Sequence, residues 1–346
     1  MNPWSGSSSA PLASDAQSAG NQSGLHLAFV ATCLLWLIAY LPTYLSLVET
    51  WSRTGTFQFA FLIFPICAVL VWGRRHWLAR VYAEPAPHGL WAALALAMLW
   101  LVGAVADINL FQHIAAVTIW PVWIYVFYGW PVARILAFPM GYVLFAIPFG
   151  NFMVVPLQTI TAHLSVAVLH LTDVPVLMEG HFIDTPAAKW HVAEACSGVK
   201  FFVATTAFGV LYAHLFFTSL TRRLIFVASS MIVPIIANGL RVFFTILIGE
   251  HFGIEYASGT DHAIFGWQFF GTVLVLLFFA GWPFHQPPAR PPAATSSARC
   301  ARRSDIMRLA LFAAAIVVVP AVLGSTLGSV DVAANAAPGL DGHGEG

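Results

Sequence analysis

The sequence predicts an all-α polytopic integral membrane protein, and three observations support that prediction. First, 59% of the 346 residues are hydrophobic and only 9% are charged, which leaves too little polar surface for a soluble chain of this length. Second, apolar stretches long enough to cross about 30 Å of hydrocarbon as helices recur along the chain. Third, basic residues fall in alternate connections between these stretches, as a single membrane topology requires.

The apolar stretches provide about eight or nine candidate transmembrane helices, of which the second and fifth are short. The nine candidates are residues 25–48, 57–72, 88–105, 110–128, 135–149, 199–217, 224–248, 263–282 and 307–327. A long interval, residues 150–198, separates the fifth from the sixth. Its first half, residues 154–171, is amphipathic and predicts a helix lying on the membrane. Its second half is polar and turn-rich and predicts a small extramembrane hairpin or loop.

Composition divides the chain into four regions. Residues 1–24 are rich in Ser, Gly, Ala and Pro, lack apolar periodicity and predict a disordered N-terminal tail. Residues 25–282 form the predicted transmembrane core. Residues 283–306 are a Pro- and Arg-rich linker, and residues 307–346 hold an additional transmembrane helix and a C-terminal tail.

The basic loops predict the orientation, because lysine and arginine are retained on the cytoplasmic side during insertion. These loops carry Arg74, Arg75 and Arg80, then Arg134, then Arg222 and Arg223, and finally Arg290, Arg299, Arg302, Arg303 and Arg308. The connections between them, around Asp107, in residues 150–198 and in residues 250–261, carry acidic residues and few cations. We therefore expect these three connections to face outward and the linker to be cytoplasmic.

Charge balance and cysteine spacing argue against several classes of function. Fifteen Lys and Arg balance fifteen Asp and Glu, so nothing indicates a nucleic-acid partner. The four cysteines are far apart in sequence, with no CxxC pair and no Cys/His ligand spacing. They are Cys33, Cys67, Cys196 and Cys300. The pattern indicates neither a disulfide framework nor a zinc site, and we expect no metal and no cofactor.

The first segment with chemical potential is HVAEACSGVKFF, residues 191–202, where Cys196 lies just before the sixth span. A thiol at a helix N-terminus lies near unpaired backbone N–H groups and the positive end of the helix dipole, both of which favour the thiolate. Lys200 would add to that effect. The alternative is a buried structural cysteine, and this segment alone leaves both open. Glu194 is expected to be a solvated loop carboxylate rather than a catalytic one.

The second segment, IIANGLRVFFTILIGEHFG, places Arg241 deep inside an apolar span. Counted back from Gly249, Arg241 lies roughly 12 Å below the outer end of the helix. A lone guanidinium at that depth costs at least ~2.5 kcal/mol, so it is expected to face a polar cavity or a partner. Asn238 shares its helix face and could hold it or share a ligand. The alternative is an arginine that snorkels outward and only anchors the helix.

The third segment, GTDHAIFGWQFF, places His262 at the outer mouth of the eighth span. The predicted topology puts it on the same membrane face as Cys196 and the open side of Arg241. A thiol, an imidazole and a guanidinium on one face are the ingredients for acyl transfer through a thioester. The thiol attacks a peptide carbonyl, the imidazole shuttles protons, and the guanidinium stabilises the thiolate or the oxyanion.

These segments resemble the exosortase and archaeosortase family of polytopic membrane transpeptidases. The resemblance rests on EACSGVK, then NGLRV, then His262 followed four residues later by Gly266. It implies that Cys196 is the nucleophile, that Arg241 and His262 complete a triad, and that Asn238 is paired with the arginine. Further supporting or substrate-binding candidates are Glu194, Ser197, Gly198, Lys200 and Gly266.

The sequence departs from the family pattern in two places. Lys200 stands where many relatives have arginine or another polar residue, which leaves the triad untouched. Residues 307–346 lie outside the common core, so the additional helix and tail belong to a subfamily or form an accessory segment.

The resemblance implies a cysteine peptidase and transpeptidase of the bacterial cytoplasmic membrane, with its active site facing the periplasm or exterior. Its expected partners are secreted proteins with a C-terminal sorting tail, the lipid bilayer and an envelope acceptor, but no nucleic acid. Such a tail has a motif such as Pro-Glu-Pro, an apolar helix and a basic cluster. Two other classes remain open, namely a transporter and a non-catalytic component of an exopolysaccharide or protein export complex. A transporter usually shows internal repeats, and none is evident here.

Overall fold

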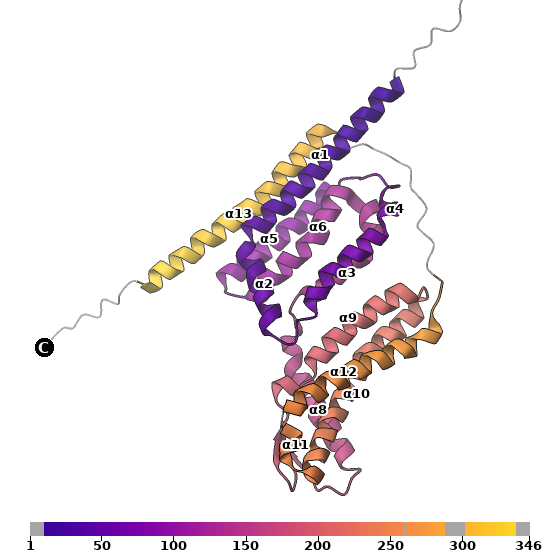
Figure 1. Ribbon diagram of the computed structural model, residues 1–346. Helices are drawn as coiled ribbons and strands as arrows, with labels where there is room; N and C mark the ends of the chain where they lie inside the picture. Colours follow the sequence, from indigo (N-terminus) through magenta and orange to yellow (C-terminus); the bar gives the residue numbers. More distant parts are fainter. Residues whose placement is uncertain (1–9, 259, 288–301, 337–346) are drawn as a thin grey trace, which may run out of the picture. The chain divides into compact units, whose positions relative to one another are not determined.

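The computed structural model describes the backbone of residues 10–258, 260–287 and 302–336 (Figure 1). The chain folds into two compact units. The first unit contains Met1–Thr50, Ala60–Ile147 and Pro291–Gly346, and the second contains Trp51–Phe59 and Pro148–Arg290. The predicted outward segments around Cys196, Arg241 and His262 all belong to the second unit.

The first unit is a bundle of apolar helices. Its elements are α1 (Ala10–Ala39), α2 (Leu41–Arg53, which runs on into the second unit), α3 (Ala60–Gly73), α4 (Arg75–Leu78), η1 (Pro87–Gly89), α5 (Leu90–Val105), α6 (Asn109–Ile135), α7 (Ala137–Tyr142), η2 (Val143–Ala146) and α13 (Arg303–Ala336). Helices α1 and α13 lie side by side (Figure 1). The Tyr40 hydroxyl donates a hydrogen bond to the Val317 carbonyl at 3.0 Å, and Ala97 and Ala313 are fully buried in the same cluster. Small residues such as Ala97 on α5 and Ala313 on α13 let packed helices approach one another closely.

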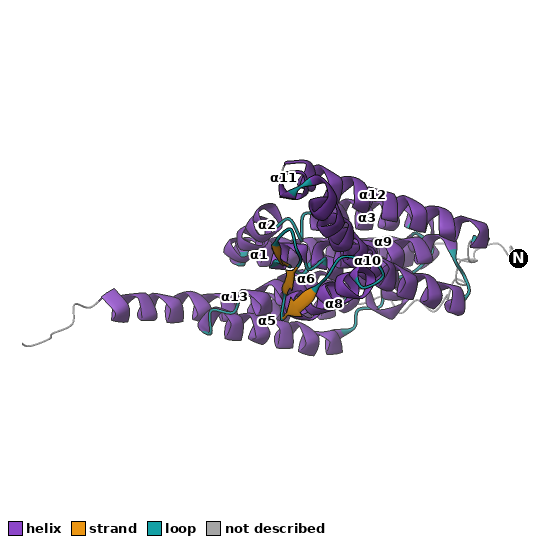
Figure 2. Cartoon of the chain, turned by 90° about the horizontal axis from the view of Figure 1, so that it is seen from below, coloured by secondary structure: helices purple, strands orange, loops and turns teal. Residues whose placement is uncertain are grey.

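The second unit contains the predicted site. Its elements are η3 (Gly150–Met153), α8 (Val154–Leu169), β1 (Leu177–Glu179), β2 (Phe182–Asp184), β3 (Lys189–His191), η4 (Glu194–Cys196), α9 (Val199–Phe216), α10 (Leu220–Phe252), α11 (Ile254–Ser258), α12 (Thr260–Gly281) and η5 (Trp282–Phe284). Helix α10 packs against α8, α9 and α12. The three strands, orange in Figure 2, form an antiparallel sheet in the order β1-β2-β3, and β2 packs against α8.

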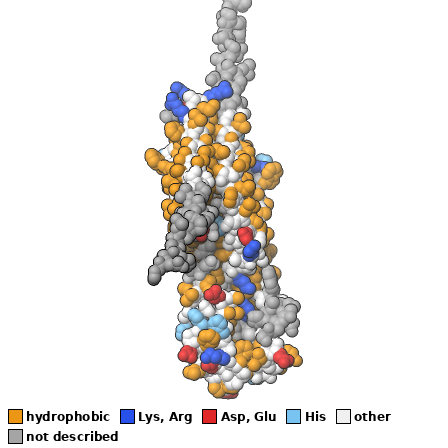
Figure 3. All heavy atoms as spheres, turned by 90° about the vertical axis from the view of Figure 1, so that its left-hand side faces the viewer, with side chains coloured by type: hydrophobic (Ala, Val, Ile, Leu, Met, Phe, Trp, Pro, Cys, Tyr) orange, Lys and Arg blue, Asp and Glu red, His pale blue; other side chains and the backbone are white. Residues whose placement is uncertain are grey.

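The prediction of an all-α polytopic membrane protein is confirmed. Within the described residues, seven helices are long and apolar enough to cross a membrane, and three more apolar helices are shorter. Each of the nine predicted spans overlaps one of these helices. The second and fifth spans, expected to be short, correspond to the shorter helices Ala60–Gly73 and Ala137–Ala146. Hydrophobic side chains cover much of the face drawn in Figure 3.

The first helix differs from the predicted first span at both ends. It begins at Ala10, so residues 10–24, which we expected to be a disordered tail, are helical, whereas residues 1–9 lie outside the described part of the chain. The helix ends at Ala39, and α2 begins at Leu41. Pro42 explains this break, because proline lacks an N–H and its ring collides with the carbonyl four residues earlier.

Residues 154–171 also differ from the expected surface helix. With the preceding turn, α8 forms one of the seven helices long and apolar enough to cross a membrane. One face of α8 is buried, and the helix packs along α10. The buried polar residues on this face are Gln158, Thr161 and Ser165. The polar stripe that indicated a membrane-surface helix therefore faces protein. The predicted hairpin is present as β1, β2 and β3.

The start of the predicted linker is anchored to the second unit. The Gln286 side-chain oxygen accepts hydrogen bonds from the backbone N–H groups of Thr218 and Ser219, both at 2.8 Å. His285 stacks on Phe216 with ring centroids 4.3 Å apart. Residues 288–301, including Cys300, lie outside the described residues.

Candidate functional site

Cys196 ends a single 3-10 turn that leads into α9. The Cys196 N–H donates to the Ala193 carbonyl at 2.8 Å, and the Ser197 N–H donates to the Glu194 carbonyl at 3.0 Å. The first residue of α9 is Val199, so the half-buried thiol lies beside the N-terminus of the helix, as the sequence predicted. Glu194, in the same turn, is exposed.

Gly198 shapes the connection between this turn and the helix. Its φ of +83° is in the left-handed region, which residues with a Cβ adopt at a cost. A Cβ on Gly198 would lie 2.7 Å from the Cγ of Asn238. Glycine is therefore needed both for the turn and for the close approach of the turn to α10.

Asn238 on α10 holds the turn that carries Cys196. Its Nδ2 donates to the Cys196 carbonyl at 2.8 Å and to the Thr161 hydroxyl at 3.0 Å. The Thr161 hydroxyl in turn donates to the Ser197 carbonyl at 3.4 Å. The amide is 2% exposed, and its Oδ1 accepts no hydrogen bond from any described residue. Helices α8 and α10 thus hold the backbone carbonyls of Cys196 and Ser197 in place.

Arg241 lies one turn after Asn238 and points into the bundle. Its side chain is only 5% exposed, and its guanidinium carbon is 5.6 Å from the ring centroid of Phe201 on α9. On α12, a Cβ at Gly266 would lie 3.6 Å from that guanidinium carbon, and Phe270 stacks on Phe201 at 4.8 Å. Arg241 is therefore enclosed by α9, α10 and α12 and does not extend outward as an anchoring side chain would.

Two cationic side chains of the site face one aromatic ring. The Lys200 ammonium lies 5.1 Å from the ring centroid of Phe201, the same ring that faces Arg241. Both cations therefore lie near the start of α9, the helix that Cys196 precedes.

The structure brings together Cys196, Gly198, Lys200, Asn238, Arg241 and Gly266. Ser197 is also buried at this place, where its hydroxyl accepts a 3.5 Å hydrogen bond from the Val199 N–H. His262 lies in the first turn of α12, four residues before Gly266, so the two positions share a helix face. The His262 side chain lies outside the described residues.

Helix α8 contributes to the site in a way that the sequence did not predict. Thr161 bonds to Asn238, the Ser165 hydroxyl donates to the Gly239 carbonyl at 2.9 Å, and the Gln158 amide donates to the Val192 carbonyl just before the Cys196 turn. The signal was the spacing i, i+3, i+7, which places three polar residues on one face of an apolar helix. The same spacing predicts a surface helix, because the partner face on α10 cannot be recognised from the sequence.

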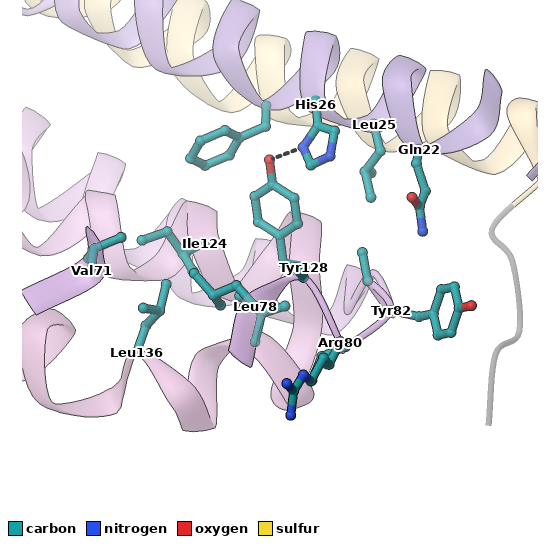
Figure 4. A pocket seen from close by; sticks show the side chains of 15 residues that line it. Gln22, Leu25, His26, Val71, Leu78, Arg80, Tyr82, Ile124, Tyr128 and Leu136 are labelled. Carbon is teal, nitrogen blue, oxygen red and sulfur yellow. Dashed lines mark hydrogen bonds between the residues drawn. The ribbon is translucent and has the colours of Figure 1, made fainter. Parts of the chain in front are cut away.

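The first unit has a separate pocket of about 630 Å³ between α1, α3, α4 and α6 (Figure 4). Its lining is mostly apolar, with a 2.8 Å hydrogen bond between His26 and Tyr128 on one wall. None of the predicted site residues lines it. This pocket therefore gives no support to a role in the chemistry at Cys196.

Comparison with known proteins identifies one family. Residues 51–279, more than half of the chain, match the family described as transmembrane exosortase. The match includes η4, α9, α10 and nearly all of α12, but not α13. No curated protein and no solved structure matches the chain.

Proposed function

Because the chain belongs to the transmembrane exosortase family, we propose that it is a membrane-embedded cysteine peptidase and transpeptidase with Cys196 as its nucleophile. Its substrates are secreted proteins with a C-terminal sorting tail, which consists of a short motif such as Pro-Glu-Pro, an apolar helix and a basic cluster. The product is transferred to an acceptor of the cell envelope. The site faces the periplasm or exterior from the cytoplasmic membrane of a bacterium.

The local environment of Cys196 is the observation that supports this proposal. The thiol is at a helix N-terminus, Asn238 holds its backbone carbonyl, and the cations of Lys200 and Arg241 face the Phe201 ring in the first turn of that helix. A structural cysteine needs neither cations nor a fixed backbone. The two other cysteines whose side chains are described, Cys33 and Cys67, have no comparable partners, since Cys33 is buried among apolar residues and Cys67 bonds to the Pro139 carbonyl.

The proposed reaction has two halves. The Cys196 thiolate attacks the scissile carbonyl carbon, and the C–N bond breaks as His262 gives a proton to the leaving amine. This leaves a thioester on Cys196. The acceptor nucleophile then attacks the thioester carbon and gives its proton to His262, and the C–S bond breaks to regenerate the thiolate. Arg241 stabilises the thiolate and the oxyanion of each tetrahedral intermediate.

The test is replacement of the thiol. We expect Cys196→Ala to abolish processing of a co-expressed tail-bearing substrate, measured by gel mobility, while the protein still inserts at normal abundance. Cys33→Ala and Cys67→Ser are matched controls in the first unit, and they should leave processing intact. Normal processing by Cys196→Ala would disprove the nucleophile and would favour a transporter or a non-catalytic export component.

A further inference from the structure

The strand that precedes Cys196 has an open edge. Strand β3 is the last of the three strands, and its pairing with β2 sets which backbone groups face outward. The Thr185 N–H donates to the Ala188 carbonyl and the Val192 N–H donates to the His181 carbonyl, both at 3.0 Å. These two hydrogen bonds lie just before and just after β3, and both belong to the same β2–β3 pairing. Hydrogen-bonded pairs alternate with non-hydrogen-bonded pairs along an antiparallel ladder. Trp190, opposite Ile183, is therefore the residue of β3 whose N–H and C=O groups point toward β2.

It follows that the N–H and C=O groups of Lys189 and His191 point away from β2. Both residues are exposed, and within the described part of the chain no backbone or side-chain group bonds to these N–H and C=O groups. Exposed main-chain groups at a sheet edge are a template for pairing with another extended chain. The edge is therefore available to a peptide.

Strand β3 is also rigidly attached to the helices of the site. Ile183 and Val192 are buried in a cluster with Phe243 and Ile246 of α10. Trp190 packs closely against Gly249 of α10, where a Cβ would collide with its ring. A peptide paired with β3 would thus be held in a fixed position relative to α10 and Arg241.

The edge continues along the chain toward the nucleophile. Ala193 keeps an extended backbone, with φ −66° and ψ 162°, and the next three residues form the turn that ends at Cys196. A paired strand advances about 3.4 Å per residue, so a few residues of an added strand reach from His191 to the turn. The open edge and the candidate site are therefore continuous.

We propose that the open edge of β3 binds the extended segment of the peptide substrate next to its scissile bond, by addition of a strand to the sheet. The proposal rests on the peptidase function proposed above and adds the subsite that positions the substrate. Main-chain hydrogen bonds to Lys189 and His191 supply affinity, and side chains at alternate substrate positions supply specificity.

The exposed face of the sheet indicates which side chains suit this subsite. Phe182 and His191 stack at 4.6 Å, and the Lys189 ammonium lies 5.2 Å from the Phe182 ring centroid. Lys189 also pairs with Asp184 at 3.6 Å. An added strand places every second side chain on this face. Acidic or aromatic substrate residues fit an aromatic surface with cationic character.

The first test changes the substrate and leaves the enzyme intact. Purified full-length protein is given synthetic tail peptides that are N-methylated at one position each around the scissile bond. Strand addition predicts an alternating pattern, in which methylation at every second position slows cleavage by about 3- to 10-fold and methylation between them has little effect. Sensitivity without alternation, or no sensitivity at any position, would overturn the proposal.

The second test changes the edge. His191→Pro removes an outward N–H without breaking the β2–β3 ladder, because proline is tolerated at a sheet edge. It should slow cleavage at least 3-fold more than His191→Ala, which keeps the N–H. Met178→Pro removes an outward N–H at the far edge of the sheet, on β1, and Met178→Ala is its reference, because the Met178 side chain packs against the buried cluster; these two variants should cleave at equal rates. Equal rates for His191→Pro and His191→Ala would contradict the proposal.

The two proposals fail in distinguishable ways. If unmodified peptide is not cleaved, or is cleaved equally by Cys196→Ala, the peptidase function itself is wrong. If unmodified peptide is cleaved in a Cys196-dependent manner but both edge tests fail, the function stands and only the β3 subsite is wrong. Melting temperatures of the two proline variants, measured in parallel, separate loss of binding from loss of folding.

Discussion

At the residue scale, Gly198 meets two requirements that no other residue type satisfies together. Its left-handed φ of +83° costs an L-residue about 1–2 kcal/mol. Its Cα also faces Asn238 so closely that an added Cβ would displace the amide from the Cys196 carbonyl. We expect Gly198→Ala to lose at least tenfold in processing rate and to lower the melting temperature in detergent.

Gly180 is the matched control for Gly198. Its φ is +61°, but a Cβ there meets nothing within 4 Å. Gly180→Ala therefore carries the backbone cost without the collision, and it should lower stability while leaving the processing rate nearly unchanged. If both variants lose processing equally, the contact between Gly198 and Asn238 is not what positions Cys196.

Arg241 and His262 are expected to differ in what their loss does to the reaction. Arg241 is enclosed in the bundle, where a planar and permanently charged fork can stabilise an oxyanion but cannot act as a base. We predict that Arg241→Lys and Arg241→Ala both fail to process substrate. His262→Ala should retain a slow reaction and accumulate a covalent adduct at Cys196, because loss of the imidazole slows turnover of the thioester, in which the acceptor gives up its proton, more than it slows the first attack.

Adducts at Cys196 can be measured directly. Hydroxylamine-sensitive species of high mass on non-reducing gels would identify a thioester, with expression matched by an epitope tag. If Arg241→Lys processes substrate at the normal rate, the arginine is a structural anchor and not an oxyanion ligand.

At the element scale, the contact between α8 and α10 decides whether the site forms. Gly239 lies between Asn238 and Arg241 on α10, and a Cβ there would lie 2.7 Å from the Cβ of Leu164 on α8. We expect Gly239→Ala to push α8 away, weaken the bond between Thr161 and Asn238, and reduce both processing and melting temperature. Overpacking of this kind costs about 1–3 kcal/mol, more than the roughly 0.5–1 kcal/mol that alanine gains over glycine in a helix.

Gly271→Ala on α12 provides the control for that substitution. No atom lies within 4 Å of a Cβ at Gly271, so only the gain in helix propensity remains. This variant should be as stable as the unmodified protein, or slightly more stable, and fully active. A stable and active Gly239→Ala variant would show that α8 is not needed close to α10.

Helix α13 shows that the limits of a family and of a folded unit need not coincide. It lies outside the matched residues 51–279, yet Ile306, Leu309, Ala313 and Val317 are buried in the main core of the first unit. Their spacing is that of one helix face. The additional helix is therefore part of the packed structure of its unit.

At the scale of the whole molecule, the alternation of basic loops predicts one orientation in the membrane. Cys196 should face outward and Cys300 the cytoplasm. A membrane-impermeant maleimide applied to intact cells should therefore label a variant that has only Cys196 and spare a variant that has only Cys300. Permeabilised cells are the control, in which both are labelled. The reverse pattern would overturn the orientation and with it the access of secreted substrates to the site.

The sequence by itself determined the class of the molecule and the residue types of the site. Hydropathy and helix length are local properties, so the apolar helices and the short second and fifth spans could be predicted segment by segment. The same holds for Cys196 at a helix start and for Asn238 and Arg241 one turn apart on α10. Such relations depend only on positions close together in the chain.

Only the tertiary structure decided which helix faces meet. The amphipathic stripe of α8 is equally compatible with a membrane surface and with a protein partner, and packing against α10 selects the partner. Glycines at 198 and 239 allow the close approaches that join the Cys196 turn and α8 to α10, and Gly266 places α12 in contact with the Arg241 guanidinium. These contacts link residues far apart in sequence, and their energy depends on shape complementarity across helices, which no local pattern encodes.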